Sequence, residues 1–288
     1  MDGPALRGTA MSSSSRSISC PPWQPAPVTT PAATGQPADK SQLTGGRQYH
    51  VGVAPGEVHE VVLMPGDPFR VALVAEQLDD VVEVAHQREY RTVNGTFRGM
   101  PITVCSSGMG CPSTAIGVEE LANAGATTFV RVGSTGALQP GMAIGDLVVS
   151  EGTLRNDGTT AQYVPLSYPA VPDLRLTIAL ADASLALGEQ NGFGVHVGLN
   201  ASDDAFWAET PEHLAGLTKL GILNVEMESS AMFVVARRRG LRAGMVCAVS
   251  ANLATGDVVY GRPNERLHVG WVHSVTAALE AVHALYAS

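Results

Sequence analysis

Short apolar runs recur along the chain from His50 onward, and each is bounded by glycine, aspartate or another polar residue. Runs of four to eight such residues are typical of strands buried on both faces of a sheet. The pattern predicts strands at residues 60–64, 102–107, 127–132, 146–152, 195–201, 222–227 and 243–250.

Longer stretches between these runs repeat their apolar residues at helical spacing. They predict helices at 112–125, 172–188, 228–240 and 265–287. Alternating strands and helices indicate the α/β class, as a single domain in which helices flank a central mixed β-sheet. Ligands of such folds bind at the carboxyl ends of strands, so the loops that follow the strands should hold the chemistry.

Residues 1–46 differ from the rest of the chain, because they are rich in Ser, Pro, Thr, Ala and Gly and show no hydrophobic period. Such a segment cannot bury enough apolar surface to offset the entropy of ordering it. We therefore expect a disordered N-terminal tail at 1–46 and a folded domain at 47–288. The tail also lacks the apolar core of a signal peptide, so we expect a cytoplasmic protein.

Composition narrows the possible partners. The chain has 288 residues and a formal net charge of -9, so it lacks the basic surface that nucleic acids and anionic membranes require. An anionic ligand must then be held by a few placed cations. The four cysteines form no CxxC pair and accompany no histidines at zinc spacing, which argues against a structural metal or a disulfide framework.

Three arginines lie where such a ligand could bind. The stretch "VLMPGDPFR" runs from a strand into a turn that contains Gly66 and Arg70. Arg131 interrupts the apolar run "FVRVG", where a buried charge needs a partner. Arg88 lies in "HQREY". Guanidinium groups suit phosphate, so together they predict an oxyanion clamp, although each alone also fits a surface ion pair.

Two further segments carry polar groups at strand ends. The loop "GSTG", residues 133–136, leaves backbone N–H groups and two hydroxyls free to face an anion. In "NVEMESS", Glu226 and Glu228 flank Met227 and point to opposite faces if the segment is extended, so one could serve a ligand and the other the structure. An acidic first helical turn is the alternative. The stretch "GMGCPS" fits a dinucleotide fingerprint too loosely to indicate NAD.

Taken together, six segments resemble the hexameric nucleoside phosphorylases, and uridine phosphorylase most closely. They are "PGDPFR", "HQREY", "GMGCPSTAIGVEEL", "RVGSTGALQPG", "RNDGTTAQYVPLSYPAV" and "NVEMESSAMF". The resemblance runs from Tyr49 to the C-terminus. It implies phosphate-dependent cleavage of the N-glycosidic bond of a nucleoside, which yields free base and ribose 1-phosphate without a cofactor.

The resemblance also implies a site shared between two subunits. For phosphate it implies Gly66, Arg70, Arg131 and Ser134, with Arg88 from the neighbour. For ribose it implies Glu228, the backbone of Met227, and His50 from the neighbour. For the base it implies Thr135, Gly136 and Phe206, to which we add Asn252. The residues expected to act in catalysis are Arg131, Glu228 and His50.

The shared site makes a dimer the minimal active unit. The resemblance implies a homo-oligomer, and we expect a hexamer. In the uridine phosphorylases a monovalent cation, K+, lies at the dimer interface. The matching positions here are Glu89, Met109 and Ser113.

The base half of the site departs from both branches of the family. Thr210, Glu212 and Leu253 stand where uridine phosphorylases place a Gln and two Arg. Ala251 stands where the purine branch has its general acid, with Asp257 a few residues on. We therefore expect weak uridine activity, and expect that Thr210→Gln with Leu253→Arg would raise it.

The alternatives are a purine nucleoside phosphorylase and a nucleoside-binding protein without turnover. A nucleosidase that uses water is not favoured, because it would leave the three arginines without an anion to bind.

Overall fold

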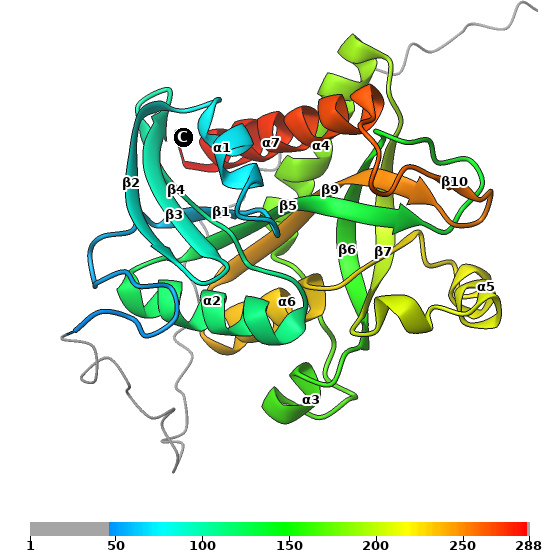
Figure 1. The fold of residues 1–288 in the computed structure, drawn as a ribbon, viewed down its shortest axis with the longest axis horizontal. Helices are drawn as coiled ribbons and strands as arrows, with labels where there is room; N and C mark the ends of the chain where they lie inside the picture. Colours follow the sequence, from blue (N-terminus) through cyan, green and yellow to red (C-terminus); the bar gives the residue numbers. More distant parts are fainter. Residues whose placement is uncertain (1–45, 287–288) are drawn as a thin grey trace, which may run out of the picture. The chain divides into compact units, whose positions relative to one another are not determined.

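The computed structural model describes residues 46–286, so the predicted tail lies outside the described part of the chain apart from Gly46. These residues form a ten-stranded mixed sheet with helices on both of its faces (Figure 1). The strands are β1 (Val61–Met64), β2 (Asp79–Gln87), β3 (Tyr90–Phe97), β4 (Met100–Cys105), β5 (Thr128–Ala137), β6 (Leu147–Asn156), β7 (Val195–Asp203), β8 (Asn224–Glu226), β9 (Arg242–Asn252) and β10 (Asp257–Val258).

The four predicted helices are present, and the structure adds four shorter ones. The predicted helices are α2 (Cys111–Ala124), α4 (Leu174–Asn191), α6 (Ser229–Arg238) and α7 (Glu265–Tyr286). The added ones are α1 (Arg70–Ala75), α3 (Thr160–Tyr163), α5 (Pro211–Lys219) and the 3-10 helix η2 (Phe206–Ala208). None of the helices within residues 46–286 is long and apolar enough to cross a membrane.

The strand order is β10-β9-β6-β7-β8-β5-β1-β4-β3-β2, and β9 also pairs with β5. The strands β5, β8, β7, β6 and β9 therefore close into a ring. The strands β1, β5 and β9 run parallel, so their carboxyl ends meet at one edge of the sheet. Met64, the last residue of β1, pairs with Arg131 on β5, which places the turn after β1 beside that arginine.

Alternate residues of β1 pack into different cores, which explains why its run "VVLM" is apolar throughout. Val61 and Leu63 belong to a cluster with buried residues of α4 and α7. Val62 and Met64 belong to a second cluster, with α2 and α6 on the opposite face of the sheet. Both faces of the strand are thus covered.

The predicted single α/β domain with a mixed sheet is confirmed, and each of the seven predicted strands is present with shifted ends. The prediction missed β2, β3 and β10. Most residues of β2 are exposed, and Val82 is 63% exposed, so this strand carries no apolar run of the kind that marks a buried strand. It forms a hairpin with β3, whose tip holds Arg88 in a left-handed conformation with φ 56°.

Candidate active site

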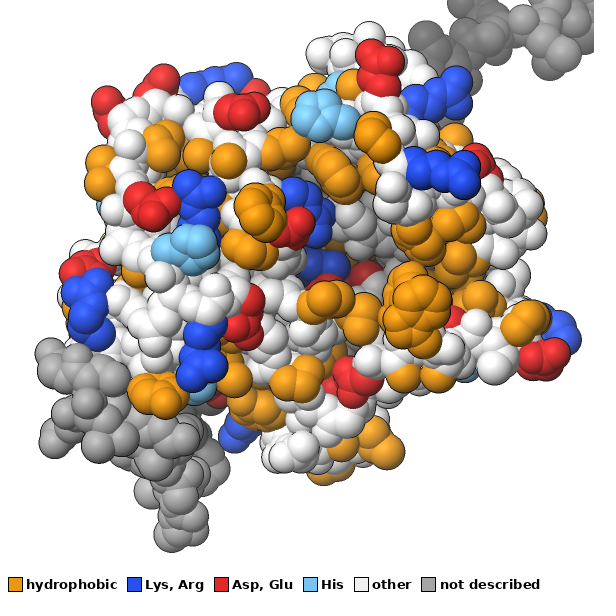
Figure 2. Space-filling view, in the orientation of Figure 1, with side chains coloured by type: hydrophobic (Ala, Val, Ile, Leu, Met, Phe, Trp, Pro, Cys, Tyr) orange, Lys and Arg blue, Asp and Glu red, His pale blue; other side chains and the backbone are white. Residues whose placement is uncertain are grey.

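A cavity of about 700 Å³ opens at the carboxyl ends of β1 and β5. Its walls come from the turn after β1, the loop before α2, the junction of β8 and α6, η2 and its following residue, the segment after β10, and α7. Figure 2 shows the hollow, with charged side chains deep inside and hydrophobic side chains around it. The cavity lies where the strand order predicts a ligand site.

Two donors converge on one hydroxyl at the wall of this cavity. Arg70 Nη1 donates to Ser134 Oγ at 3.1 Å, and Trp271 Nε1 donates to the same oxygen at 2.8 Å. The guanidinium carbon of Arg70 also lies 5.3 Å from the centre of the Trp271 ring. A serine hydroxyl has two acceptor lone pairs, so its own O–H is left to donate to another group.

Arg131 is the buried cation of the site and is only 3% exposed. Its Nε lies 2.7 Å from Glu226 Oε2, and its Nη2 forms an ion pair with Glu228. Burial acts to lower the pKa of Arg131, but the charge of Glu228 and further acidic neighbours outweigh burial and raise that pKa. The buried Nη1 makes no hydrogen bond to any residue that the structure describes. An unpaired buried donor is costly, and an anion in the cavity would satisfy it.

Gly66 lets the two guanidinium groups approach the same space. A Cβ atom built on Gly66 would lie 3.4 Å from Arg70 Nη2 and 4.0 Å from Arg131 Nη1. Burial lowers the pKa of Arg70, and the positive charge of Arg131 lowers it further. Two cations that repel each other across a cavity favour binding of an anion between them.

The two glutamates at the end of β8 have different surroundings, as predicted. Glu226 accepts hydrogen bonds from Ser202 Oγ and from the side chain and backbone N–H of Ser229. It also accepts from the Glu228 N–H at 2.9 Å. Its oxygens are thus occupied by internal donors, several of them at the start of α6. Glu226 is a structural group that fixes this junction.

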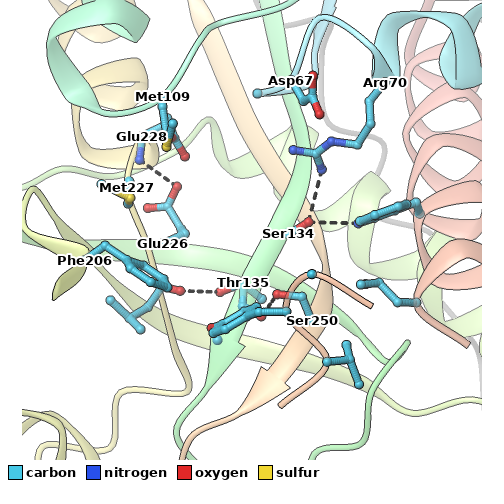
Figure 3. Close-up of a pocket in the computed structure, with 18 of the residues that line it drawn as sticks. Asp67, Arg70, Met109, Ser134, Thr135, Phe206, Glu226, Met227, Glu228 and Ser250 are labelled. Carbon is cyan, nitrogen blue, oxygen red and sulfur yellow. Dashed lines mark hydrogen bonds between the residues drawn. The ribbon is translucent and has the colours of Figure 1, made fainter. Parts of the chain in front are cut away.

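Glu228 faces the cavity across from Arg70 and Ser134 (Figure 3). Its Oε1 accepts from the Gly110 N–H at 2.7 Å, and its Oε2 pairs with Arg131. Burial raises the pKa of the Glu228 carboxyl, and the charge of Arg131 opposes that shift. A carboxylate held at both oxygens in a cavity wall has remaining lone pairs with which it can accept hydroxyl groups of a ligand.

The geometry is that of an anion site beside a carboxylate, and sequence comparison agrees with it. The family model of the phosphorylase superfamily matches residues 60–281. The chain belongs to the phosphorylase superfamily.

Several members of this superfamily are similar over most of their length. The uridine phosphorylase of Thermococcus kodakarensis is 44% identical over 242 residues, which cover 80% of this chain and 85% of the relative. The guanosine phosphorylase of Halorubrum lacusprofundi is 44% identical over 211 residues, 73% of this chain and 86% of the relative. Uridine phosphorylase of Vibrio fischeri, crystallised with 6-hydroxy-1-naphthoic acid, superposes with a TM-score of 0.75 at 33% identity, covering 84% of this chain and 98% of that one.

Most of the site residues expected from the sequence line this one cavity of the phosphorylase. They are Gly66, Arg70, Glu89, Met109, Arg131, Ser134, Thr135, Gly136, Phe206, Met227 and Glu228. The Thr135 hydroxyl is already engaged, since it donates to the Val225 carbonyl at 2.8 Å and accepts from Asn224 at 2.6 Å.

His50 and Arg88 do not line the cavity of their own chain. His50 Nδ1 lies 2.6 Å from Glu120 Oε1, and its ring meets Tyr49 edge to face at 4.7 Å between centroids. Arg88 is exposed at the hairpin tip, with its guanidinium carbon 6.0 Å from the centre of the Tyr49 ring. Both residues therefore approach the ring of Tyr49, outside the cavity lining of their own chain.

The expectation that Asn252 contacts the base is wrong for a physical reason. Asn252 is buried, and its side-chain nitrogen donates to the carbonyls of Gln139 and Met142. Its side-chain oxygen accepts from the N–H groups of Ala254 and Thr255. The amide is used entirely to hold the loop after β9, and it lies outside the cavity lining.

The three positions compared with the uracil-binding residues also lie outside the lining. Thr210 caps α5, where its hydroxyl accepts from the His213 N–H at 3.2 Å, and Glu212 is exposed on the same helix. Leu253 packs on Gly136, where an added Cβ would lie 3.0 Å from Leu253 Cδ1. The Thr210 and Leu253 side chains serve the structure, whereas Glu212 faces solvent.

Sequence reasoning missed several polar or aromatic residues of the lining. They include Glu209, Tyr260, Arg262 and Trp271. Glu209 directly precedes Thr210, the position that the family comparison aligned with the uracil-binding Gln. The comparison therefore identified the right segment but named the neighbouring residue. Arg262 and Trp271 come from a loop and a helix that no motif marks as part of the site.

Two of the residues implied for a cation have adjacent oxygens. Ser113 Oγ lies 3.0 Å from Glu89 Oε1 and also donates to the Ser107 carbonyl. Carboxylate and hydroxyl oxygens suit a hard monovalent cation, whereas the Met109 thioether is a soft ligand and its side chain is 80% exposed. Glu89 and Ser113 fit such an ion, and Met109 fits it only through its backbone carbonyl.

Proposed function

We propose that this chain is a nucleoside phosphorylase of the uridine phosphorylase type. Hydrogen phosphate attacks C1′ of the nucleoside, and the C1′–O bond forms as the C1′–N bond breaks. The base leaves with the electron pair of that bond and takes up, overall, the proton that phosphate loses. The products are free base and α-ribose 1-phosphate. The observation that carries this proposal is the unpaired, buried Nη1 of Arg131 beside the guanidinium of Arg70, because these donors have no anion within the described chain.

Phosphate is held, in this proposal, by Arg70, Arg131, the Ser134 hydroxyl and the backbone at Gly66. Departure of the base builds positive charge on the ribose ring, and a nucleophilic anion fixed on the opposite face stabilises that charge. Preorganised donors also spare the reorganisation that water would need. The reaction requires no covalent enzyme intermediate and no cofactor.

Ribose is oriented, in this proposal, by Glu228, which accepts hydrogen bonds from the 2′- and 3′-hydroxyls. The position of Glu228 beside Arg131 supports this role, because it brings the sugar next to the phosphate. Most of the rate gain then comes from holding the reactants in line. Phe206, which is 38% exposed at the cavity wall, offers a ring face for the base.

A second copy of the chain completes the site in this proposal. His50 would meet the ribose 5′-hydroxyl, and Arg88 would add a third guanidinium to the phosphate. The exposure of Arg88 and the absence of both residues from the cavity lining of their own chain support a dimer as the minimal unit. We propose a hexamer as the full assembly. Glu89 and Ser113 would hold K+ together with the same residues of the second copy.

We further propose that the enzyme works in the cytoplasm. The buried free thiols of Cys105, Cys111 and Cys247 support a reducing compartment.

The test of the proposed function is base release from a panel of nucleosides with and without phosphate, followed by chromatography. We expect release only when phosphate is present. Equal release in phosphate-free buffer would identify a hydrolase instead. A purine nucleoside phosphorylase is the second candidate, and the 44% identity to guanosine phosphorylase favours it.

A further inference from the structure

One end of the cavity brings together two segments that are far apart in the sequence. Phe206 and Glu209 come from η2 and the residue after it, and Tyr260 and Arg262 come from the segment after β10. The rings of Phe206 and Tyr260 are in contact, with centroids 5.6 Å apart and planes at 61°. The two segments in contact thus also contribute a carboxylate and a guanidinium to the cavity lining, beside the expected base-stacking ring.

Glu209 is half-buried and has no hydrogen bond or ion pair with any residue between 46 and 286. His213 is nearby, but its Nε2 is bound to Asp203 at 2.7 Å. Burial raises the pKa of the Glu209 carboxyl, the charge of Asp203 raises it further, and His213 opposes the shift. A carboxylate partly removed from water without a partner is unfavourable, and N–H donors of a ligand would relieve that cost.

Arg262 is the cation of this end. It is exposed at the cavity wall, and its guanidinium forms neither an ion pair nor a hydrogen bond with any residue between 46 and 286, although its backbone N–H donates to the Val259 carbonyl at 3.2 Å. Burial raises the pKa of the Tyr260 phenol, and the negative charge of Glu209 raises it further. The cavity end therefore offers one acceptor-only group, one donor-only group and two aromatic rings.

Guanine matches this set better than the other common bases. Its N1–H and its 2-amino group point the same way and can donate in parallel to one carboxylate, while O6 and N7 accept from an arginine. Hypoxanthine lacks the amino group, and adenine has an acceptor at N1. Uracil has a single N–H between two carbonyl oxygens. One carboxylate oxygen could accept from that N–H, but the other would face a carbonyl oxygen, which is also an acceptor.

We propose that Glu209 and Arg262 recognise the base, and that they select guanine, with Glu209 accepting from N1–H and the 2-amino group and Arg262 donating to O6 or N7. This inference rests on the proposed nucleoside phosphorylase function and names its substrate. Glu209 and Arg262 thus take the role that the sequence comparison gave to Thr210 and Leu253, whose side chains serve the structure.

The test measures kcat/KM with phosphate for guanosine, inosine, adenosine and uridine. Guanosine should be the best substrate of the wild-type enzyme. Glu209→Gln should lower the kcat/KM for guanosine by about 10- to 100-fold, the usual effect of losing hydrogen bonds to a charged group. The kcat/KM values for adenosine and uridine should change by less than about threefold. Arg262→Gln should lower the kcat/KM for guanosine and for inosine by similar factors, because guanine and hypoxanthine both carry O6 and N7.

The matched control is Glu212→Gln, an exposed glutamate in the first turn of α5 that lies outside the cavity lining. Its profile should equal that of the wild type. A wild-type enzyme that prefers uridine with phosphate, or a Glu209→Gln variant that loses all four activities equally, would overturn guanine selection while leaving the phosphorylase reaction intact.

Calorimetric binding of guanosine and uridine in phosphate-free buffer separates this inference from the proposed function. Tighter binding of guanosine that is lost in Glu209→Gln supports base recognition by Glu209 even where no phosphate-dependent turnover occurs. Tighter binding of uridine, or guanosine binding that Glu209→Gln leaves unchanged, contradicts it.

Discussion

Trp271 Nε1 and Arg70 Nη1 both donate to the Ser134 hydroxyl oxygen, at 2.8 and 3.1 Å. Because the two donors occupy both lone pairs, the Ser134 O–H has to donate elsewhere, and the cavity is beside it. Trp271 belongs to α7, far along the chain from β5. The last helix thus positions a hydroxyl of the anion site without belonging to any motif for it.

Trp271→Phe keeps an aromatic ring and removes only the N–H group. We expect the KM for phosphate to rise by about 2- to 10-fold, the effect of one ordinary hydrogen bond, while the KM for the nucleoside stays constant. Initial rates measured at varied phosphate with saturating nucleoside, and at varied nucleoside with saturating phosphate, give the two KM values. A rise in the nucleoside KM alone would show that Trp271 acts on the other half of the cavity.

Arg131→Ala and Arg70→Ala should separate stability from anion binding. Arg131→Ala leaves two buried carboxylates without their cation, so the free energy of unfolding should fall by about 3 to 5 kcal/mol, and turnover should fall by at least about 100-fold. Arg70 forms no ion pair within the described residues, so Arg70→Ala should weaken phosphate use with a smaller loss of stability. Denaturant unfolding and kinetics at varied phosphate check both. Equal destabilisation by the two variants would contradict this division.

Glu228→Gln and Glu226→Gln test the different roles of the two glutamates. Glu228→Gln should lower kcat/KM by about 10- to 100-fold for a ribonucleoside, and by less for the 2′-deoxynucleoside, which offers one hydroxyl fewer. Glu226→Gln should mainly lower the free energy of unfolding, because that carboxylate joins β8 to the start of α6. The assignment is wrong if both variants stay equally stable and lose activity alike.

Leu253→Arg should not restore a uracil contact, contrary to the expectation from the sequence. Leu253 packs on Gly136 and against the apolar cluster that includes Leu138 and Val225. An arginine there would place a charge in apolar surroundings, so we expect a lower thermal midpoint and no gain in uridine turnover. Calorimetry and uridine kinetics of the variant decide the point, and a stable variant with faster uridine cleavage would contradict it.

The sequence predicted the anion half of the cavity better than the base half, for physical reasons. Arg131 was detectable because a charge inside an apolar strand needs partners, and Glu226 and Glu228 because their spacing sends them to different neighbours. These signals are local. Glu209 and Arg262 line the same cavity from two segments whose Phe206 and Tyr260 rings are in contact, and no local pattern encodes that arrangement.

The same limit applies to the fold. The buried strands of the sheet centre carry apolar runs and were found, whereas β2 is exposed and was missed. The hairpin that carries Arg88 therefore appeared only in the structure. Asn252 shows the reverse error, since a polar residue near the site was taken for a ligand contact although its amide holds a loop.

The identity of the sugar product tests the central claim most directly. The enzyme is incubated with guanosine, and separately with uridine, in phosphate buffer, and phosphorus and proton NMR follow the products. We predict that base and α-ribose 1-phosphate appear in equal amounts, and that neither forms when phosphate is omitted. Release of free ribose with the base, at a rate independent of phosphate, would contradict the account.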